Sequence, residues 1–198
     1  MIKISYDFFY MSRMLKDKLC SKMYEYLYSD DNQEVERMEP CYNGIINNLY
    51  NLTYESTHII DNIYLGNAYN ASHYYNLVKN NIGLIINVTD EICNYYSDLD
   101  EFEYYNINIK DNNNNHILPY INDVLIKINN YNEINPGKNI LIHCYMGSSR
   151  SASLTLAYLL KFHNMSIENG IKFIKDKRSL VNLNTTFLLD LDEWIKHK

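Results

Sequence analysis

Apolar residues in the second part of the chain recur in short runs of strand length, separated by polar turns. The run 84–88 (LIINV) is continuously apolar, which is typical of a strand covered on both faces. The stretch 104–109 (YYNINI) alternates and predicts a further strand. The runs 58–60 and 63–65 are separated by two polar residues, which predicts two strands joined by a tight turn. A fifth strand is expected to start at Ile140.

Between and after these runs, apolar positions recur at spacings of three and four residues, which predicts helices. The expected helices span residues 71–80, 118–131, 151–163, 166–176 and 185–197. The helix over 151–163 is deeply apolar, so we expect it in the core. Strands that alternate with helices predict an α/β fold, with a central, mostly parallel sheet of about five strands and helices on both faces.

The first part of the chain has a different pattern. Residues 5–28 combine an apolar helical stripe with several lysines and an arginine. Residues 29–40 are polar, and the pattern over residues 44–54 predicts a second short helix. We therefore expect an N-terminal helical extension over residues 1–55 and one regular domain over residues 56–198. The first helix either packs against that domain or serves as a docking segment for a partner.

Composition narrows the class of protein. The 198 residues are 46% hydrophobic and 21% charged, which is typical of a globular chain. The net charge of −6 argues against a general binder of nucleic acid or of an anionic membrane. No apolar run approaches the length of a membrane span. The four cysteines include no C-x-x-C pair, so neither a zinc site nor a disulfide framework is expected, and a cytoplasmic or nuclear location fits best.

The stretch 140–151 (ILIHCYMGSSRS) carries the chemistry. A strand runs into a tight loop, and a helix starts directly after it, so several backbone N–H groups converge on one point beside the positive end of the helix dipole. A glycine gives the loop the freedom that an anion-binding nest needs. The predicted phosphate-binding residues are Tyr145, Met146, Gly147, Ser148, Ser149 and Arg150.

Cys144 and Arg150 are the predicted reactive pair of this loop. The guanidinium of Arg150 can grip two oxygens of a phosphate at once. Cys144 lies at the base of the cradle, where the same field favours thiolate over thiol, and a thiolate below a bound phosphate is a nucleophile aimed at phosphorus. The loop therefore predicts phosphoryl transfer. Because Arg150 and the loop amides already neutralise the phosphate, no metal or other cofactor is expected.

The pattern His-Cys, five residues, Arg-Ser resembles the signature of cysteine-dependent protein phosphatases, and GSSRS is most similar to the dual-specificity branch. The resemblance extends over roughly residues 57–197, through the blocks IYLGN, LIINVTDE, ILPYI, AYLL and MSIENGIKFIKDKR. It implies a small, atypical dual-specificity phosphatase with a phosphocysteine intermediate. Where the family usually has Pro-Asn-x-Gly-Phe, residues 183–187 read LNTTF, which questions the support that this segment offers the loop.

The resemblance also implies a general acid on a loop about thirty residues before the cysteine. Asp111 follows the strand over 104–109 and is the best candidate. Asp98 and Asp100 precede that strand and fit less well. Without the cysteine loop, Asp111 would be interpreted as a turn residue beside asparagines.

Three further residues are expected to support the loop. By the same resemblance, Ser151 donates a hydrogen bond to the sulfur as the thiolate leaves the phosphocysteine. His143 is expected to orient the loop through ring hydrogen bonds, and Asn87, at the end of a neighbouring strand, is a candidate buttress of the loop.

The predicted substrates are phosphoproteins that carry phosphotyrosine, phosphoserine or phosphothreonine. The chain has no separate phosphotyrosine-recognition insert, so a shallow pocket is expected. The loop contains no lysine, which disfavours polyphosphorylated lipids but leaves other phosphate esters open. The alternatives are a phospho-binding scaffold that lacks turnover and, with less support, a sulfur transferase.

Overall fold

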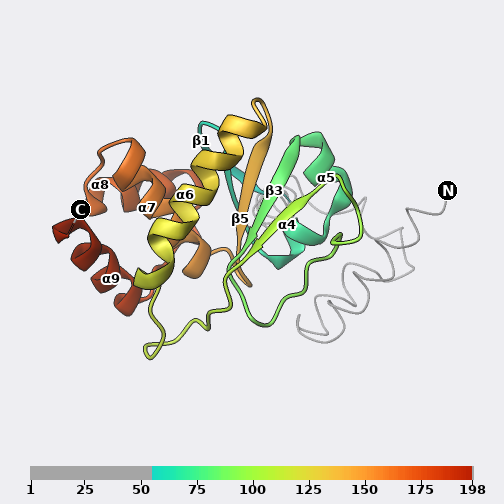
Figure 1. Ribbon diagram of the computed structural model, residues 1–198. Helices are drawn as coiled ribbons and strands as arrows, with labels where there is room; N and C mark the ends of the chain where they lie inside the picture. The colour runs from blue at the N-terminus through green and yellow to red at the C-terminus, as the bar shows by residue number, and fades with distance from the viewer. Residues whose placement is uncertain (1–54, 198) are drawn as a thin grey trace, which may run out of the picture.

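The structure is a computed structural model that describes residues 55–197 (Figure 1). The expected helices over 5–28 and 44–54 and the polar stretch between them lie outside the described residues. The boundary between an extension and a regular domain near residue 56 stays a prediction.

One five-stranded sheet organises the described residues. Its strands, in spatial order β1-β2-β5-β3-β4, pair in parallel except for the antiparallel β1–β2 hairpin. The prediction of a mostly parallel sheet is confirmed. The strands are β1 Thr57–Ile60, β2 Ile63–Gly66, β3 Ile82–Asn87, β4 Glu103–Asn106 and β5 Asn139–His143.

Helices cover both faces of this sheet, as predicted (Figure 1). One face packs against four helices: α6 Leu118–Ile134, α7 Arg150–Phe162, α8 Ile167–Lys177 and α9 Thr185–Lys196. The other face packs against the short helices α4 Ala68–Ser72 and α5 Tyr74–Lys79. The apolar core of this second face includes aromatic side chains from the long segment between β3 and β4.

The centre of the molecule is formed by β3, β5 and α7. All six residues of β3 are buried, which explains its continuous apolar run, and β5 is buried from Ile140 to His143. Every residue of α7 from Arg150 to Leu160 is buried as well, so the prediction that this helix lies in the core is confirmed. The loop between β5 and α7 is therefore held on both sides by deeply buried elements.

Three local predictions differ from the structure. The helix expected over 71–80 is two short helices, because α4 starts earlier, capped by Asn67, and breaks at His73. The strand expected over 104–109 ends at Asn106, because β4 lies at the sheet edge and the chain then turns Ile107 and Ile109 into the core. Strand β3 begins two residues before the predicted run 84–88 and contains Gly83, where the Tyr131 hydroxyl occupies the space of a Cβ.

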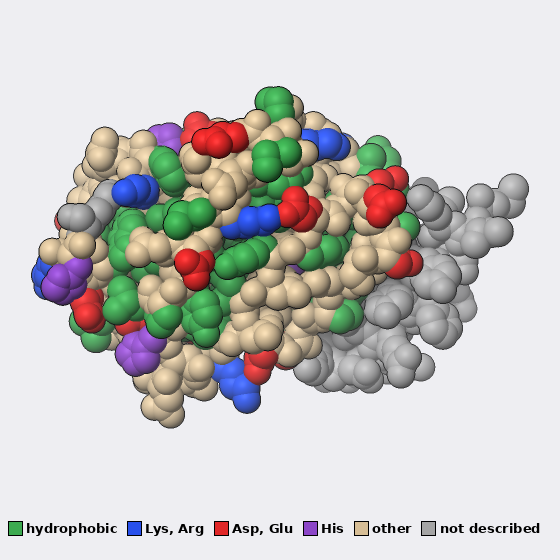
Figure 2. Space-filling view, in the orientation of Figure 1, with side chains coloured by type: hydrophobic (Ala, Val, Ile, Leu, Met, Phe, Trp, Pro, Cys, Tyr) green, Lys and Arg blue, Asp and Glu red, His purple; other side chains and the backbone are tan. Residues whose placement is uncertain are grey.

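Charged side chains on the face drawn in Figure 2 are scattered, and the basic ones do not form a stripe there. Within residues 55–197, no helix is both long enough and apolar enough to cross a membrane.

Candidate active site

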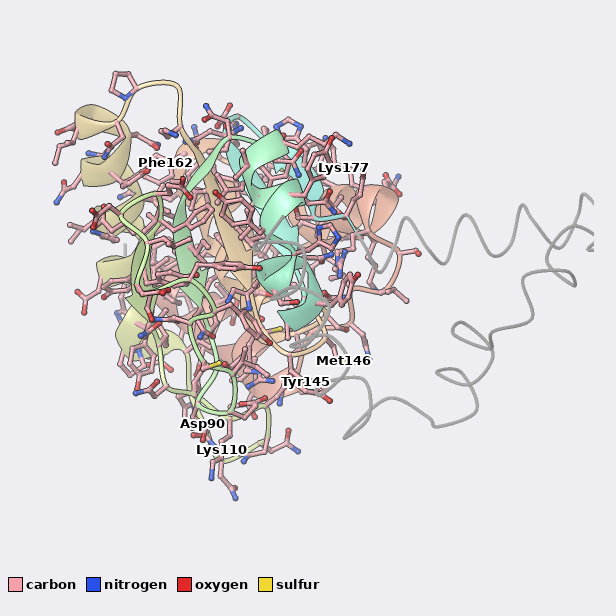
Figure 3. All side chains as sticks on the ribbon, turned by 90° about the vertical axis from the view of Figure 1, so that its right-hand side faces the viewer. Asp90, Lys110, Tyr145, Met146, Phe162 and Lys177 are labelled. Carbon is pink, nitrogen blue, oxygen red and sulfur yellow. The ribbon has the colours of Figure 1, made fainter. Side chains whose placement is uncertain are left out.

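Three loops meet at the carboxyl ends of the parallel strands, which is the usual place for a site in an open α/β sheet. Residues 144–149 join β5 to α7 and form the phosphate loop. The loop after β3 contains Asp90 and the loop after β4 contains Lys110. Both lie at the same end of the molecule as Tyr145 and Met146 (Figure 3).

Cys144 lies at the base of the phosphate loop with 1% of its surface exposed. Its Sγ accepts hydrogen bonds from the backbone N–H of Gly147 at 3.2 Å and from the Oγ of Ser151 at 3.1 Å. Both donors favour a negatively charged sulfur, and the N-terminus of α7 adds positive potential beside them. The structure therefore places Ser151 at the sulfur, as its predicted role requires.

Gly147 is the residue that allows the loop to turn. Its φ of +66° lies in the left-handed region, which side chains other than glycine rarely adopt. A Cβ at this position would also lie 2.5 Å from the carbonyl oxygen of Gly66 and 2.7 Å from Nη2 of Arg178. Both conformation and space exclude a side chain here.

Arg150 begins α7 and is only 4% exposed. Its Nη1 and Nη2 donate to the two carboxylate oxygens of Glu91 at 2.9 and 2.7 Å, and Nη1 also donates to the carbonyl of Ile109 at 3.1 Å. Burial alone lowers the pKa of Arg150, but the hydrogen bonds to Glu91 and the nearby negative charges outweigh it and raise that pKa. The guanidinium is therefore fully charged at any working pH.

Glu91 was not identified from the sequence. Partial burial raises the pKa of its carboxyl, but the hydrogen bonds from Arg150 dominate the balance and hold that pKa at about 2. The motif block LIINVTDE contains this residue, although no spacing rule connects it to an arginine 59 positions later.

Asp111 lies beside the phosphate loop. Its Oδ1 accepts hydrogen bonds from the Oγ of Ser149 at 3.1 Å and from the Nδ2 of Asn184 at 3.3 Å. Its Oδ2 lies 3.8 Å from the Nε of Arg150, and a third of the side chain is exposed. Among the described residues, no hydrogen bond or ion pair connects Asp98 or Asp100 to the loop, so the geometry favours Asp111 as the candidate acid.

Arg178, at the end of α8, is a second residue that sequence analysis missed. It is fully buried, and its Nε donates to the carbonyl of Gly147 at 2.9 Å while Nη2 donates to that of Met146 at 3.4 Å. Burial lowers the pKa of this guanidinium. By holding two loop carbonyls from behind, Arg178 keeps the loop N–H groups turned towards the site.

The segment 180–184 supports the outer side of the loop, which resolves the question raised by its departure from the family pattern. The Oγ of Ser148 donates to the carbonyl of Leu180 at 2.7 Å, and the N–H of Asn182 donates to the carbonyl of Ser148 at 3.0 Å. The N–H of Asn184 donates to the Oγ of Ser149 at 3.1 Å.

Tyr145 and Met146 are the remaining residues of the phosphate loop. The carbonyl of Tyr145 accepts a hydrogen bond from the N–H of Ala68 at 3.1 Å, which ties the loop to the start of α4. The side chain of Met146 is 62% exposed at the rim, in a position to contact whatever carries the phosphate.

Within residues 55–197, no three His, Cys, Asp or Glu side chains are grouped so that they could hold a metal ion.

Asn87 supports a different loop from the one predicted. Its Nδ2 donates to the carbonyl of Ile92 at 2.7 Å and to the Oδ1 of Asn94 at 3.1 Å, while its Oδ1 accepts from the Oγ1 of Thr89 at 2.7 Å. It therefore organises the loop after β3, which carries Glu91, and reaches the phosphate loop only indirectly.

His143 is almost fully buried at the end of β5. Burial lowers its pKa to about 4, against a smaller raising effect of the neighbouring Cys144 backbone, so the ring is neutral at pH 7. A neutral ring does not shuttle protons readily at that pH. Its Nδ1 has no hydrogen-bond partner among the described residues, and its orienting role stays a prediction.

Comparison with known proteins agrees with this geometry. The family described as the catalytic domain of dual specificity phosphatases matches residues 63–197. The chain belongs to the dual specificity phosphatase family.

Relatives of this phosphatase domain include the protein phosphatase Slingshot of Drosophila melanogaster, which is 35% identical over 138 residues, or 70% of this chain and 13% of the relative. A probable rhodanese domain-containing dual specificity protein phosphatase of Dictyostelium discoideum is 35% identical over 144 residues, or 73% of this chain and 29% of the relative. The chain thus spans less than a third of either relative's length.

A solved structure with the same fold is the human tyrosine phosphatase-like serine/threonine/tyrosine-interacting protein. It superposes with a TM-score of 0.67 at 25% identity and covers 72% of this chain and 97% of its own. The phosphatase fold predicted from the sequence is confirmed.

Proposed function

We propose that this protein hydrolyses phosphotyrosine, phosphoserine and phosphothreonine in proteins through a phosphocysteine intermediate. One observation carries the proposal: the buried Sγ of Cys144 accepts hydrogen bonds from Gly147 and Ser151 at the start of α7. Hydrogen bonds to the sulfur stabilise the negative charge that it carries as a nucleophile and again as a leaving group.

In the first step, the thiolate of Cys144 attacks phosphorus and the bond from phosphorus to the ester oxygen breaks. Asp111, in its protonated form, gives its proton to the departing oxygen, so that an alcohol or phenol leaves. Arg150 and the loop N–H groups hold the three phosphoryl oxygens and stabilise their charge in the transition state.

In the second step, water attacks phosphorus of the phosphocysteine and transfers a proton to the Asp111 carboxylate. The sulfur–phosphorus bond breaks, inorganic phosphate forms and the thiolate returns. The hydroxyl of Ser151, 3.1 Å from Sγ, donates to the sulfur as its charge reappears. The positions of Asp111 and Ser151 support these roles.

The family and its relatives support proteins as the substrate class. The relatives named above are protein phosphatases, and the matched family has dual specificity. The loop side chains between Cys144 and Arg150 carry no lysine that would meet additional phosphates of a lipid headgroup. A phosphatase of another phosphate ester is the nearest alternative within the same chemistry.

The test is hydrolysis of an activated aryl phosphate and of phosphotyrosine, phosphoserine and phosphothreonine peptides. We expect Cys144→Ser to lower the rate by more than about 10³-fold, because an alcohol replaces the thiolate nucleophile. The variant should still bind inorganic phosphate, since the cradle remains. We expect a chelator to leave wild-type activity unchanged.

Full activity of Cys144→Ser, or loss of wild-type activity in the chelator, would contradict the proposal.

The second candidate function is a phospho-binding scaffold, favoured only by the structural neighbour that is named a phosphatase-like interacting protein. Tight binding of phosphopeptides by the wild type without any turnover would establish that function instead.

We also propose that residues 1–55 form a helical extension that packs or docks, that phosphoproteins rather than nucleic acids or membranes are the partners, and that the protein acts in the cytoplasm or nucleus. The acidic net charge of −6 supports this choice of partners.

A further inference from the structure

The guanidinium of Arg150 has one side whose N–H donors have hydrogen-bond partners and one side whose donors do not. A guanidinium has five N–H donors in a fixed planar arrangement. Glu91 takes one donor from each terminal nitrogen, at 2.9 and 2.7 Å, and the carbonyl of Ile109 takes the second donor of Nη1 at 3.1 Å. Two donors are left, one on Nη2 and the one on Nε.

These two free donors point the same way along one edge of the planar group. The Nε atom is buried and has no hydrogen-bond partner among the described residues, and the nearest acidic oxygen, on Asp111, is 3.8 Å away. A buried donor without a partner is costly unless a ligand completes it. Two parallel N–H groups match two oxygens of a tetrahedral phosphate.

We propose that Glu91 is a positioning residue that holds Arg150 with this edge facing the phosphate loop. The inference deepens the proposed function, on which it rests. Glu91 touches no reacting atom. It acts by occupying the far end of the guanidinium, so that the edge formed by Nε and Nη2 remains available for the substrate.

The position of Glu91 is itself fixed by the loop after β3. Thr89 caps this loop by accepting a hydrogen bond from the N–H of Ile92 at 3.1 Å, and Asn87 holds the carbonyl of Ile92 at 2.7 Å. Asp90 pairs with Lys110 at 3.7 Å and so ties the loop to the one that carries the candidate acid. Glu91 therefore projects from a braced turn rather than from a free surface loop.

If Glu91 is neutralised, an effect of its charge and an effect on the position of Arg150 predict opposite changes in phosphate affinity. A carboxylate near an anion site repels phosphate, so its removal should tighten phosphate binding if charge were the main effect. If Glu91 positions Arg150, its removal should weaken phosphate binding, because the guanidinium loses the contact that orients it. The sign of the change separates the two explanations.

The experiment compares wild type with Glu91→Gln and Glu91→Asp. The readouts are the affinity for inorganic phosphate, measured by calorimetry, and kcat and KM with an aryl phosphate. We expect Glu91→Gln to weaken phosphate binding about tenfold, as the loss of a charge-assisted hydrogen bond does, and to lower kcat/KM by about 10²-fold through misplacement of Arg150. Glu91→Asp keeps the charge, so its phosphate affinity and kcat/KM should lie between those of wild type and Glu91→Gln.

Asp98→Asn is the matched control, because it removes the same charge from the same segment between β3 and β4, where among the described residues no hydrogen bond or ion pair joins the carboxylate to Glu91 or Arg150. We expect it to bind phosphate as tightly as wild type or more tightly. Thermal unfolding of each variant shows whether the fold is intact.

A double variant gives the decisive test. In the Arg150→Lys background the fork is absent, so Glu91→Gln should have little further effect on phosphate affinity. Three outcomes would each overturn the inference: phosphate binding by Glu91→Gln at wild-type strength or above, an equal loss in Asp98→Asn, or the same loss in the Arg150→Lys background. If the wild type shows no turnover, the proposed function fails, while the phosphate affinities still decide the role of Glu91.

Discussion

At the scale of single residues, Ser149 shows how the site keeps its anion-binding donors free. It occupies the N-cap position of α7, where a serine side chain usually accepts a hydrogen bond from the helix. Here its Oγ instead donates to Asp111 at 3.1 Å and accepts from the N–H of Asn184 at 3.1 Å. The first N–H groups of α7 are thus left to an incoming anion, and the same hydroxyl places the candidate acid.

Replacement of Asp111 by asparagine tests the acid directly. We expect Asp111→Asn to lower the rate about 10²-fold for phosphotyrosine and alkyl phosphates, whose leaving oxygen needs a proton. An activated aryl phosphate should be affected much less, since its leaving group departs without one. The measurement is kcat/KM across a series of leaving groups. Equal losses across the series would contradict the role of Asp111 and indicate damage to the site instead.

At the scale of secondary-structure elements, α9 provides the cap that α6 lacks. Ile117, at the N-cap of α6, has no capping side chain. The buried carboxylate of Asp190 on α9 instead accepts hydrogen bonds from the N–H groups of Ile117 at 2.7 Å and Leu118 at 3.2 Å. A negative group here also interacts favourably with the helix dipole. The loop with Asp111 enters α6 at this point, so α9 fixes one end of that loop.

Asp190→Ala should therefore destabilise the protein by about 2–3 kcal/mol, because it leaves two N–H groups of α6 without an acceptor. The measurement is urea unfolding. Asp192→Ala is the control on the same helix, since its exposed pair with Lys196 contributes only about 0.3–0.5 kcal/mol. Equal effects of the two variants would show that Asp190 does not cap α6.

At the scale of the whole molecule, the site makes the fold sensitive to acid. Burial holds the pKa of His143 at about 4 in the folded protein, below the ordinary value of 6.5 for a histidine. Between these values the unfolded chain binds a proton that the folded protein does not. The free energy of unfolding therefore falls as the pH falls from about 6.5 to about 4. The pKa of Glu91 is lowered from 4.5 to about 2, so the free energy of unfolding continues to fall as the pH falls through this lower range.

We expect His143 alone to account for about 3 kcal/mol of lost stability between pH 6.5 and pH 4, from the difference between its two pKa values. His143→Gln cannot titrate and should unfold with a flatter pH dependence in this window, whatever its stability at pH 7. Urea unfolding at several pH values measures the slope. A slope unchanged by the substitution would mean that another group causes the acid sensitivity.

The sequence by itself determined the elements and the chemistry of one loop. Apolar periodicity is a local property, so it identified β3, β5 and α7 and the helices around them, but it erred where the tertiary context decides boundaries, as at His73 and Asn106. The cradle from Cys144 to Arg150 is contiguous in the chain, which is why its residues could be identified together. Asp111 required the family resemblance in addition.

Only the tertiary structure identified the partners that orient this chemistry. Glu91 lies 59 residues from Arg150, Arg178 lies 31 residues from Gly147, and Asp190 lies 73 residues from Ile117. No helical or strand period connects such distant positions. Their contacts follow from strand order: β3 lies beside β5 although β4 and α6 come between them in the chain, so the loops after the two strands meet at one edge of the sheet.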